Sequence, residues 1–255
     1  PAIQSDLMDR SPTVDIFPDR TAVSRALAGR VADEIRAKPD IVLGLPTGRT
    51  PLELYAELVR LHAAGEIDFS RVTTFNLDEF LGVQAAHPGS YRSYMNRHLF
   101  EQVNIDPARI HFLNGGAPDP AAECERYEHE IDAAGGIDLQ IIGIGTNGHI
   151  GFNEPAPELE ARTHRVTLKP ETRRSNAALF GGDADRVPAE ALSMGMGTIL
   201  QARMVVLLAT GAGKANCVER VVQGPITTLL PASFLQLHRH AELMLDAPAA
   251  SALRA

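Results

Sequence analysis

The chain has 255 residues, of which 44% are hydrophobic and 22% are charged, a balance that is ordinary for a soluble globular protein. This length is enough for one well-buried α/β domain, although length alone would also allow two. The net charge of −8 argues against broad attraction to nucleic acid or acidic membranes. A few local donors can still hold a small anion, because distant charges are screened.

Cysteine usage and hydropathy predict the compartment. Cys124 and Cys217 have no CxxC spacing, which indicates a reducing environment and neither a disulfide framework nor a metal site. No apolar run approaches the roughly 18 residues that a membrane-spanning helix needs. The N-terminal stretch carries Asp6, Asp9 and Asp15 and has no apolar core, so it does not resemble a signal peptide. We therefore expect a cytoplasmic protein.

Short apolar strands alternate with amphipathic helices along the chain, and this pattern predicts an open, mostly parallel α/β sheet. No internal repeat, low-complexity tract or linker interrupts it, so we expect one domain over residues 1–255. The expected elements are an irregular lead-in 1–18 with an edge strand near 14–17, helix 21–36, strand 41–45, helix 52–64, strand 72–76, helices 90–100 and 121–134, strands 139–142, 163–168 and 203–208, helix 215–223, and strand 243–245 closing the sheet.

The loop between the strand at 41–45 and the helix at 52–64 has the composition of an anion site. Thr47 and Thr50 supply hydroxyls, Arg49 supplies a cation, and Gly48 lets free backbone amides approach a ligand at a helix start. An ordinary βα turn also favours glycine, threonine and proline. The accompanying hydroxyls and the cation favour phosphate binding.

Two further strand ends carry candidate groups. Asp78 and Glu79 follow the strand at 72–76; such adjacent acids are often simple caps for the next element, and Asp78 could instead be a catalytic base. A second glycine-rich junction at 211–214 places Lys214 where the following helix begins. A cation is electrostatically unfavourable at a helix N-terminus, so we expect Lys214 to bind a ligand anion.

The richest segment is 138–155, which follows the central strand at 139–142. It presents the Asn147 carboxamide, the His149 imidazole and the Glu154 carboxylate on glycine-rich backbone. Ligands of open α/β sheets sit at the carboxyl ends of the strands, where such proton-transfer groups belong. Alone, His149 could simply satisfy a loop. Three such groups close together favour a catalytic site.

Metal and dinucleotide sites fit the sequence poorly. His149 and Glu154 do not form the i, i+4 histidine pair of a zinc helix, and His238 and His240 stand apart from other ligands. Neither glycine loop has GxGxxG or GxxxxGK[ST] spacing. We expect no metal and no organic cofactor, but a small phosphorylated ligand beside acid/base groups. The polar segment 169–182, bounded by proline and glycine, could be a mobile flap over it, within a lid of about 164–193.

Five sequence blocks together resemble the glucosamine-6-phosphate deaminase family. They are LGLPTGRTP at 43–51, FNLDEF at 75–80, HPGSY at 87–91, GIGTNGHIGFNEP at 143–155 and GAGK at 211–214. The resemblance implies a single-domain, Rossmann-like α/β/α sandwich. It also implies an isomerising hydrolase that converts glucosamine 6-phosphate and water to fructose 6-phosphate and ammonia without a metal or cofactor.

The family resemblance also implies a role for each matching residue. His149 would open the pyranose ring, oriented by Glu154 and Asn147, and Asp78 would move a proton from C2 to C1. Thr47, Gly48, Arg49, Thr50 and Lys214 would hold the phosphate.

Several positions depart from the family pattern. Phe80 stands where relatives have a tyrosine, Ala178 where they carry a phosphate-binding arginine, and Arg49 where they have glycine. We hypothesise that Arg49 replaces the missing arginine, and the exchange leaves galactosamine 6-phosphate open as a substrate. His164 and Val166 are among the unmatched positions of the activator site in hexameric relatives, which predicts non-cooperative kinetics and a monomer or small homo-oligomer.

Other functions remain on the same fold. One is a 6-phosphogluconolactonase-like hydrolase, but a lactonase has little use for a base at Asp78. Another is a non-catalytic sugar-phosphate sensor, which would carry a basic helix-turn-helix segment that the acidic N-terminal region does not offer. We therefore expect an enzyme whose only partner is a small amino-sugar phosphate.

Overall fold

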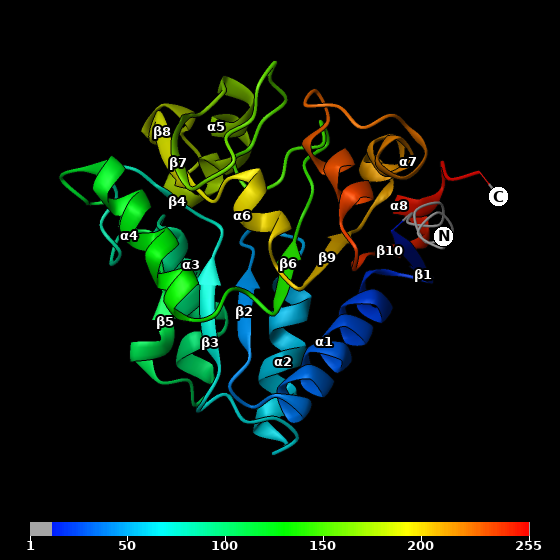
Figure 1. The fold of residues 1–255 in the computed structure, drawn as a ribbon, viewed down its shortest axis with the longest axis horizontal. Helices are drawn as coiled ribbons and strands as arrows, with labels where there is room; N and C mark the ends of the chain where they lie inside the picture. Colours follow the sequence, from blue (N-terminus) through cyan, green and yellow to red (C-terminus); the bar gives the residue numbers. More distant parts are fainter. Residues whose placement is uncertain (1–11, 255) are drawn as a thin grey trace, which may run out of the picture.

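The central feature of the computed structural model is a seven-stranded sheet in the order β1-β10-β9-β6-β2-β3-β5 (Figure 1). All six neighbouring pairs in the sheet are parallel. The structure describes residues 12–254. The strands are β1 (Thr13–Phe17), β2 (Val42–Leu45), β3 (Thr73–Asn76), β5 (Ile110–His111), β6 (Leu139–Ile142), β9 (Met204–Ala209) and β10 (Ala241–Asp246).

Helices cover both faces of this sheet. One face packs against α1 (Arg20–Ala37), α2 (Leu52–Ala63) and α3 (Tyr91–His98). The other packs against α4 (Pro120–Ala133), α6 (Met196–Leu200), α7 (Ala215–Gln223) and α8 (Ala247–Ala250).

Alternation along the strands explains the two cores. In β9, Val205 and Leu207 point to the face covered by α4, α6 and α7, whereas Val206 and Leu208 point to the α1–α2 face. Successive side chains of a strand point to opposite faces, so a continuously apolar strand must be covered on both. The expected α/β/α arrangement follows directly from these apolar runs.

A second, three-stranded antiparallel sheet lies beside the carboxyl ends of the main strands (Figure 1). It consists of β4 (Asp78–Phe80), β8 (Glu190–Ser193) and β7 (His164–Thr167), in the order β4-β8-β7. Between β7 and β8 the chain forms α5 (Pro170–Asn176) and a 3-10 helix, Ala177–Phe180. A separate small core around Phe80, Phe152 and Phe180 joins this sheet to the 3-10 helix that follows α5.

The sequence predicted most main-sheet elements within one or two residues, with three differences. The strand at 243–245 does not close the sheet, because β10 lies between β9 and β1, and β1 and β5 form the edges. The strands β4, β5 and β8 and the short helices α5 and α6 had not been expected. The first eleven residues of the predicted lead-in lie outside the described part of the chain.

No helix within residues 12–254 has the length and apolar character to cross a membrane.

Candidate active site

The candidate groups lie on loops that leave four adjacent strands. In the sheet, β9, β6, β2 and β3 are consecutive neighbours, and all are parallel. Their carboxyl ends therefore share one edge of the sheet (Figure 1). The segments after them carry Lys214, His149, Thr47 and Asp78, respectively, and Asp78 is the first residue of β4. The fold brings together residues that lie up to 167 positions apart in the sequence, at the edge where α/β sheets bind ligands.

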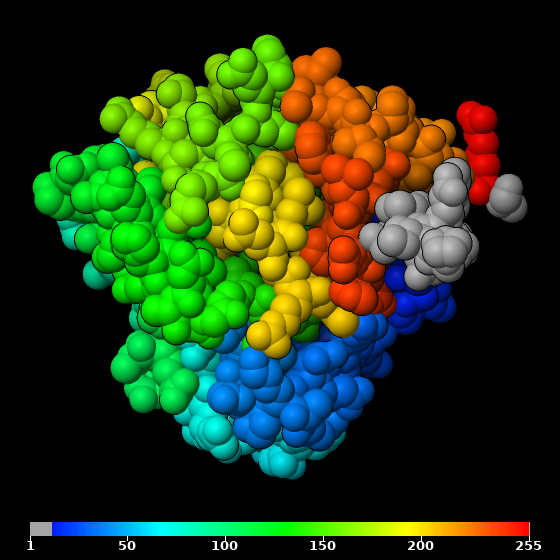
Figure 2. Space-filling view, in the orientation of Figure 1, coloured from blue at the N-terminus to red at the C-terminus, as the bar shows by residue number. Residues whose placement is uncertain are grey.

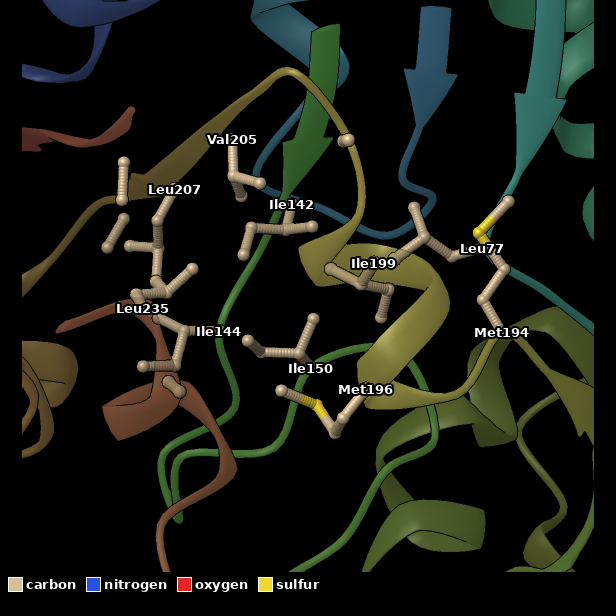
Figure 3. Close-up of a cluster of buried hydrophobic side chains, with 14 of the residues drawn as sticks. Leu77, Ile142, Ile144, Ile150, Met194, Met196, Ile199, Val205, Leu207 and Leu235 are labelled. Carbon is tan, nitrogen blue, oxygen red and sulfur yellow. The ribbon is translucent and has the colours of Figure 1, made fainter. Parts of the chain in front are cut away.

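The loop after β6 is anchored by apolar side chains. Ile144 and Ile150 are buried in a cluster with Ile142, Leu207 and Met196, as Figure 3 shows. Further out, the loop packs against the segment near 228, where Thr228 donates to the carbonyl of Pro157, and these two segments adjoin in Figure 2. The loop therefore holds His149 on a fixed support.

Glycine at two positions of this loop makes room for the imidazole and its support. A Cβ on Gly145 would lie 2.2 Å from the His149 ring, so only glycine fits there. Gly148 has φ +89°, a left-handed conformation, and a Cβ there would collide with Leu230. The glycine-rich sequence of the loop thus has a steric cause.

His149, Asn147 and Glu154 form a hydrogen-bonded group. His149 Nδ1 lies 2.7 Å from Asn147 Oδ1 and 3.5 Å from Glu154 Oε1, and Asn147 Nδ2 donates to Glu154 Oε2 at 2.7 Å. Because both neighbours of Nδ1 are acceptors, the proton belongs on Nδ1, which leaves Nε2 as the free base. The ring is partly exposed, so its reactive nitrogen can meet a ligand.

Glu154 is buried but ionised. Burial alone would raise its pKa, but hydrogen bonds with His149, Thr172 and Asn147 outweigh that effect and lower it to about 2. A carboxylate held in this state can orient the imidazole beside it. Glu154 and Asn147 thus both contact the imidazole, and their orienting role stays a prediction.

Asp78 has the opposite environment. It is 6% exposed, and its carboxylate has no hydrogen-bond or ion-pair partner within residues 12–254. Burial, with a smaller contribution from the neighbouring Glu79, raises the pKa of Asp78 to about 8. An unpaired buried carboxyl is costly for folding and is typical of a general acid/base.

Asp78 also lies close to the His149 loop. A Cβ on Gly151 would be 3.5 Å from Asp78 Oδ2, and Gly151 is only two residues from His149. Asp78 and the loop that carries His149 therefore border the same region of the molecule. The absence of a side chain at Gly151 keeps that space open.

Glu79 has a structural function. Its carboxylate accepts hydrogen bonds from the amides of Phe80, Tyr91 and Arg92 at 2.8–2.9 Å. Burial raises the pKa of Glu79 to about 7 despite these amide hydrogen bonds. Of the two adjacent acids, Glu79 therefore holds the start of α3, and Asp78 remains free for chemistry.

The loop after β2 presents backbone donors. The hydroxyls of Tyr55 and Tyr94 bond to the carbonyls of Pro46 and Gly48, respectively, which fixes the loop from behind. Within residues 12–254, the amides of 48–50 donate to no protein acceptor. Gly48 has φ +104°, and Arg49 is exposed. Free amides of this kind suit an anion, and phosphate binding by this loop stays a prediction.

Lys214 reaches the same edge from β9. Its Nζ donates to the carbonyl of Ile144 at 2.7 Å, and burial lowers its pKa. The preceding Gly211, at φ +91°, is fixed by Asp246, which accepts its amide. The ammonium thus lies over the His149 loop, and its predicted contact with a ligand anion stays a prediction.

The sequence did not single out two side chains at this site. Thr172 of α5 is buried and donates to Glu154 Oε1 at 2.5 Å. Tyr91 donates to Asn176 of α5 at 3.1 Å and lies near Thr47. Tyr91 belongs to the HPGSY block, and Thr172 to the predicted flap, but only their contacts reveal why they matter.

Two positions that depart from the family pattern have clear environments. Phe80 is fully buried against Tyr91, Phe152 and Phe180, so the residue in this place is part of the small core. Ala178 is exposed on the 3-10 helix after α5. No cluster of three or more potential metal-ligating side chains occurs within residues 12–254.

Comparison with known proteins supports one family. The family model for glucosamine-6-phosphate isomerases/6-phosphogluconolactonase matches residues 18–245. Glucosamine-6-phosphate deaminase 2 of Bacillus subtilis (strain 168) is 49% identical over 228 residues, covering 89% of this chain and 92% of that protein. The glucosamine-6-phosphate deaminase of Halothermothrix orenii is 50% identical over 231 residues, covering 91% and 95%.

Solved structures agree at the level of the fold. A monomeric glucosamine-6-phosphate deaminase superposes with a TM-score of 0.91 at 43% identity, covering 94% of this chain and 99% of that chain. The 6-phosphogluconolactonase of Trypanosoma brucei has a TM-score of 0.74 at 19% identity, covering 95% and 99%, and this shows a shared fold alone. The predicted single-domain Rossmann-like fold is confirmed. Because the family model matches residues 18–245, the chain belongs to the glucosamine-6-phosphate isomerase/6-phosphogluconolactonase family.

Proposed function

We propose that the protein is a glucosamine-6-phosphate deaminase, which converts glucosamine 6-phosphate and water to fructose 6-phosphate and ammonia. The observation that carries this proposal is a free, buried Asp78 next to the loop that holds the oriented His149. A second support is the identity of nearly half of the residues with curated deaminases over about nine tenths of the chain.

In this proposal, His149 opens the sugar ring. Its Nε2 takes the proton of the anomeric hydroxyl. The imidazole then gives a proton to O5 of the sugar as the C1–O5 bond breaks. Asn147 and Glu154 hold the imidazole for both steps and stabilise its protonated form.

Asp78 then moves a proton within the open chain. Its carboxylate takes the C2 proton and returns it at C1, which produces the imine of fructose 6-phosphate. Water adds to that imine at C2, and ammonia leaves. The raised pKa of Asp78, about 8, suits a group that must both take and return a proton.

The phosphate would bind at the other end of the sugar. The free amides of 48–50, the hydroxyls of Thr47 and Thr50, and the Lys214 ammonium would contact it. Binding energy from this non-reacting group orients C1 and C2 against the acid/base residues.

Arg49 can supply the guanidinium that is missing at Ala178, because it is exposed on the loop after β2 that carries the free amides. Arg49→Ala should raise KM for glucosamine 6-phosphate about 10-fold, with kcat nearly unchanged. The matched control is Arg71→Ala, which removes an exposed arginine just before β3. Equal KM values for the two variants would refute a phosphate-binding role of Arg49.

An ammonia-coupled assay tests the activity directly. It compares glucosamine 6-phosphate, galactosamine 6-phosphate and glucosamine without phosphate, with 6-phosphogluconolactone in a separate hydrolysis assay. We expect ammonia from glucosamine 6-phosphate and at least 100-fold less from the unphosphorylated sugar. Preference for the galacto epimer would reassign the substrate, and lactone hydrolysis without ammonia release would overturn the proposal.

We also propose that the protein is a cytoplasmic monomer with hyperbolic kinetics. The 43% identical deaminase that superposes on it is monomeric, and both cysteines are free and buried. Light scattering coupled to size exclusion measures the oligomeric state. A sigmoidal rate curve that N-acetylglucosamine 6-phosphate makes hyperbolic would contradict this proposal.

A further inference from the structure

The short helix α5 contacts both ends of the candidate site. Thr172 and Asn176 are four positions apart on this helix, so their side chains lie on one face of it. Thr172 contacts Glu154, which supports His149, and Asn176 contacts Tyr91, which lies beside the phosphate loop. One helical turn therefore connects two parts of the site that come from different strands.

The first contact is a buried, charge-assisted hydrogen bond. Thr172 is 7% exposed, and its hydroxyl donates to Glu154 Oε1 at 2.5 Å. The same oxygen lies 3.5 Å from His149 Nδ1. Because this one atom serves both partners, a shift of Thr172 alters the carboxylate that orients the imidazole.

The second contact has a defined polarity. The Asn176 amide nitrogen donates to the carbonyl of Thr172 at 2.9 Å, which leaves its oxygen to accept from the Tyr91 hydroxyl at 3.1 Å. Burial raises the pKa of Tyr91, and a hydrogen bond with the Thr47 side chain opposes that rise. The Tyr91 hydroxyl thus lies between the phosphate loop and α5.

A third contact fixes the start of the helix near the catalytic loop. Lys169 donates to the carbonyl of Pro155, the residue directly after Glu154. Beyond the other end of α5, Phe180 of the following 3-10 helix packs against Phe80. Contacts at the start, middle and end of α5 therefore hold this helix against the site, as in a closed lid.

We propose that Thr172 and Asn176 are positioning residues through which occupancy of the phosphate loop sets the orientation of the Glu154–His149 pair. A phosphate on Thr47 orders Tyr91, Tyr91 holds Asn176, and Thr172 on the next turn fixes Glu154. This inference rests on the proposed function, and it assigns the phosphate a second role besides binding. The sugar phosphate itself would align the ring-opening histidine.

Thr172→Val tests the first contact, because it removes the hydroxyl and keeps the shape of the side chain. We expect kcat on glucosamine 6-phosphate to fall about 10-fold with KM within about twofold of wild type. Thr172→Ser restores the hydroxyl and should recover most of that loss. The control is Ser175→Ala, which removes a hydroxyl from an exposed part of the same helix and should leave kcat unchanged.

Tyr91→Phe removes the other contact, and a double-mutant cycle measures the connection. If α5 transmits the effect, Thr172→Val combined with Tyr91→Phe should lose far less than the product of the two single losses. A double loss equal to that product would show independent contacts and overturn the inference. Thermal unfolding of each variant separates these effects from loss of folding.

The outcomes separate this inference from the proposed function. A wild-type protein that releases no ammonia from glucosamine 6-phosphate refutes the function. An active wild type with Thr172→Val indistinguishable from Ser175→Ala in kcat refutes only the positioning role. A loss in Thr172→Val that Thr172→Ser does not recover would also refute it, because the loss would then come from packing.

Discussion

Asp78 and Glu154 are both buried carboxyl groups at the same edge of the sheet, yet their environments oppose each other. Glu154, on the loop after β6, is hydrogen-bonded by Thr172 and Asn147 and lies near His149, and its pKa is about 2. Asp78, after β3, has no partner within residues 12–254, and its pKa is about 8. Burial raises the pKa in both, and for Glu154 alone the hydrogen bonds and the nearby His149 outweigh that rise.

The difference supports the proposed roles, in which Asp78 reacts and Glu154 supports His149. A group whose pKa lies near the pH of the solution can take and return a proton. A group that stays ionised can only orient and stabilise a neighbour. The four predictions below test this division, beginning with the largest expected effect.

Replacing Asp78 should abolish turnover. Asp78→Asn removes the base but keeps the shape, so kcat should fall by on the order of 10²–10⁴-fold, while KM changes little. The ammonia-coupled assay measures this loss. Glu171→Gln, an exposed carboxylate on α5, is the control and should behave as wild type. An Asp78→Asn variant with more than a tenth of wild-type kcat would remove Asp78 from the mechanism.

Replacing Glu154 should slow turnover without abolishing it. Glu154→Gln keeps a hydrogen-bonding side chain but loses the charge that supports protonated His149. We expect kcat to fall about 10- to 100-fold, from the worth of a hydrogen bond to a charged group. The same assay measures it at saturating substrate. If the loss exceeded that of Asp78→Asn, the roles assigned to the two acids would have to be exchanged.

The difference in stability between Asp78→Asn and the wild type should grow as the pH rises. The folded-state pKa, about 8, lies above the ordinary 3.8, so the folded protein binds more protons and loses stability as pH rises between these values. Asp78→Asn lacks this cost. Its melting temperature should equal that of wild type near pH 4 and exceed it by roughly 5 °C above pH 8. Calorimetry across this range would contradict us if the difference shrank.

Glu154→Gln should show the reverse, with a smaller difference. Here the folded-state pKa, about 2, lies below the ordinary 4.5, so the ionised carboxylate stabilises the fold above pH 4.5. That contribution is lost as pH falls toward 2. The variant should melt a few degrees, about 2–4 °C, below wild type at pH 7, and this gap should narrow in acid. A gap that widened in acid would contradict the hydrogen bonding assigned to Glu154.

Local sequence was sufficient to find six of the seven strands of the main sheet and most of the candidate site residues. Apolar runs such as 203–208 and 41–45 identified buried strands, because a strand covered on both faces needs nearly continuous hydrophobicity. Glycine-rich loops after those strands marked where the chain needed left-handed turns or close approach, as at Gly48 and Gly145. Polar residues on these loops were then the natural candidates for chemistry.

The small second sheet was beyond the reach of local patterns. Its strands β4 and β8 are three and four residues long and pair with partners distant in sequence, such as Asp78 with Ser193. Short segments carry little periodicity, and their strand form depends on tertiary pairing. For the same reason local spacing did not show that Glu79 holds the start of α3, and Asp78 was singled out as a base only by the family resemblance.

The sequence by itself determined the family, the parallel α/β architecture and the residue types available at each strand end, because each depends on motifs or hydrophobicity within a few positions. Only the tertiary structure decided that Glu79 holds α3, that Asp78 stays unpaired, and that Thr172 reaches Glu154 from 18 residues away. Hydrogen bonding and desolvation depend on which atoms meet after folding, and those meetings set the pKa that divides a reacting carboxyl from a supporting one.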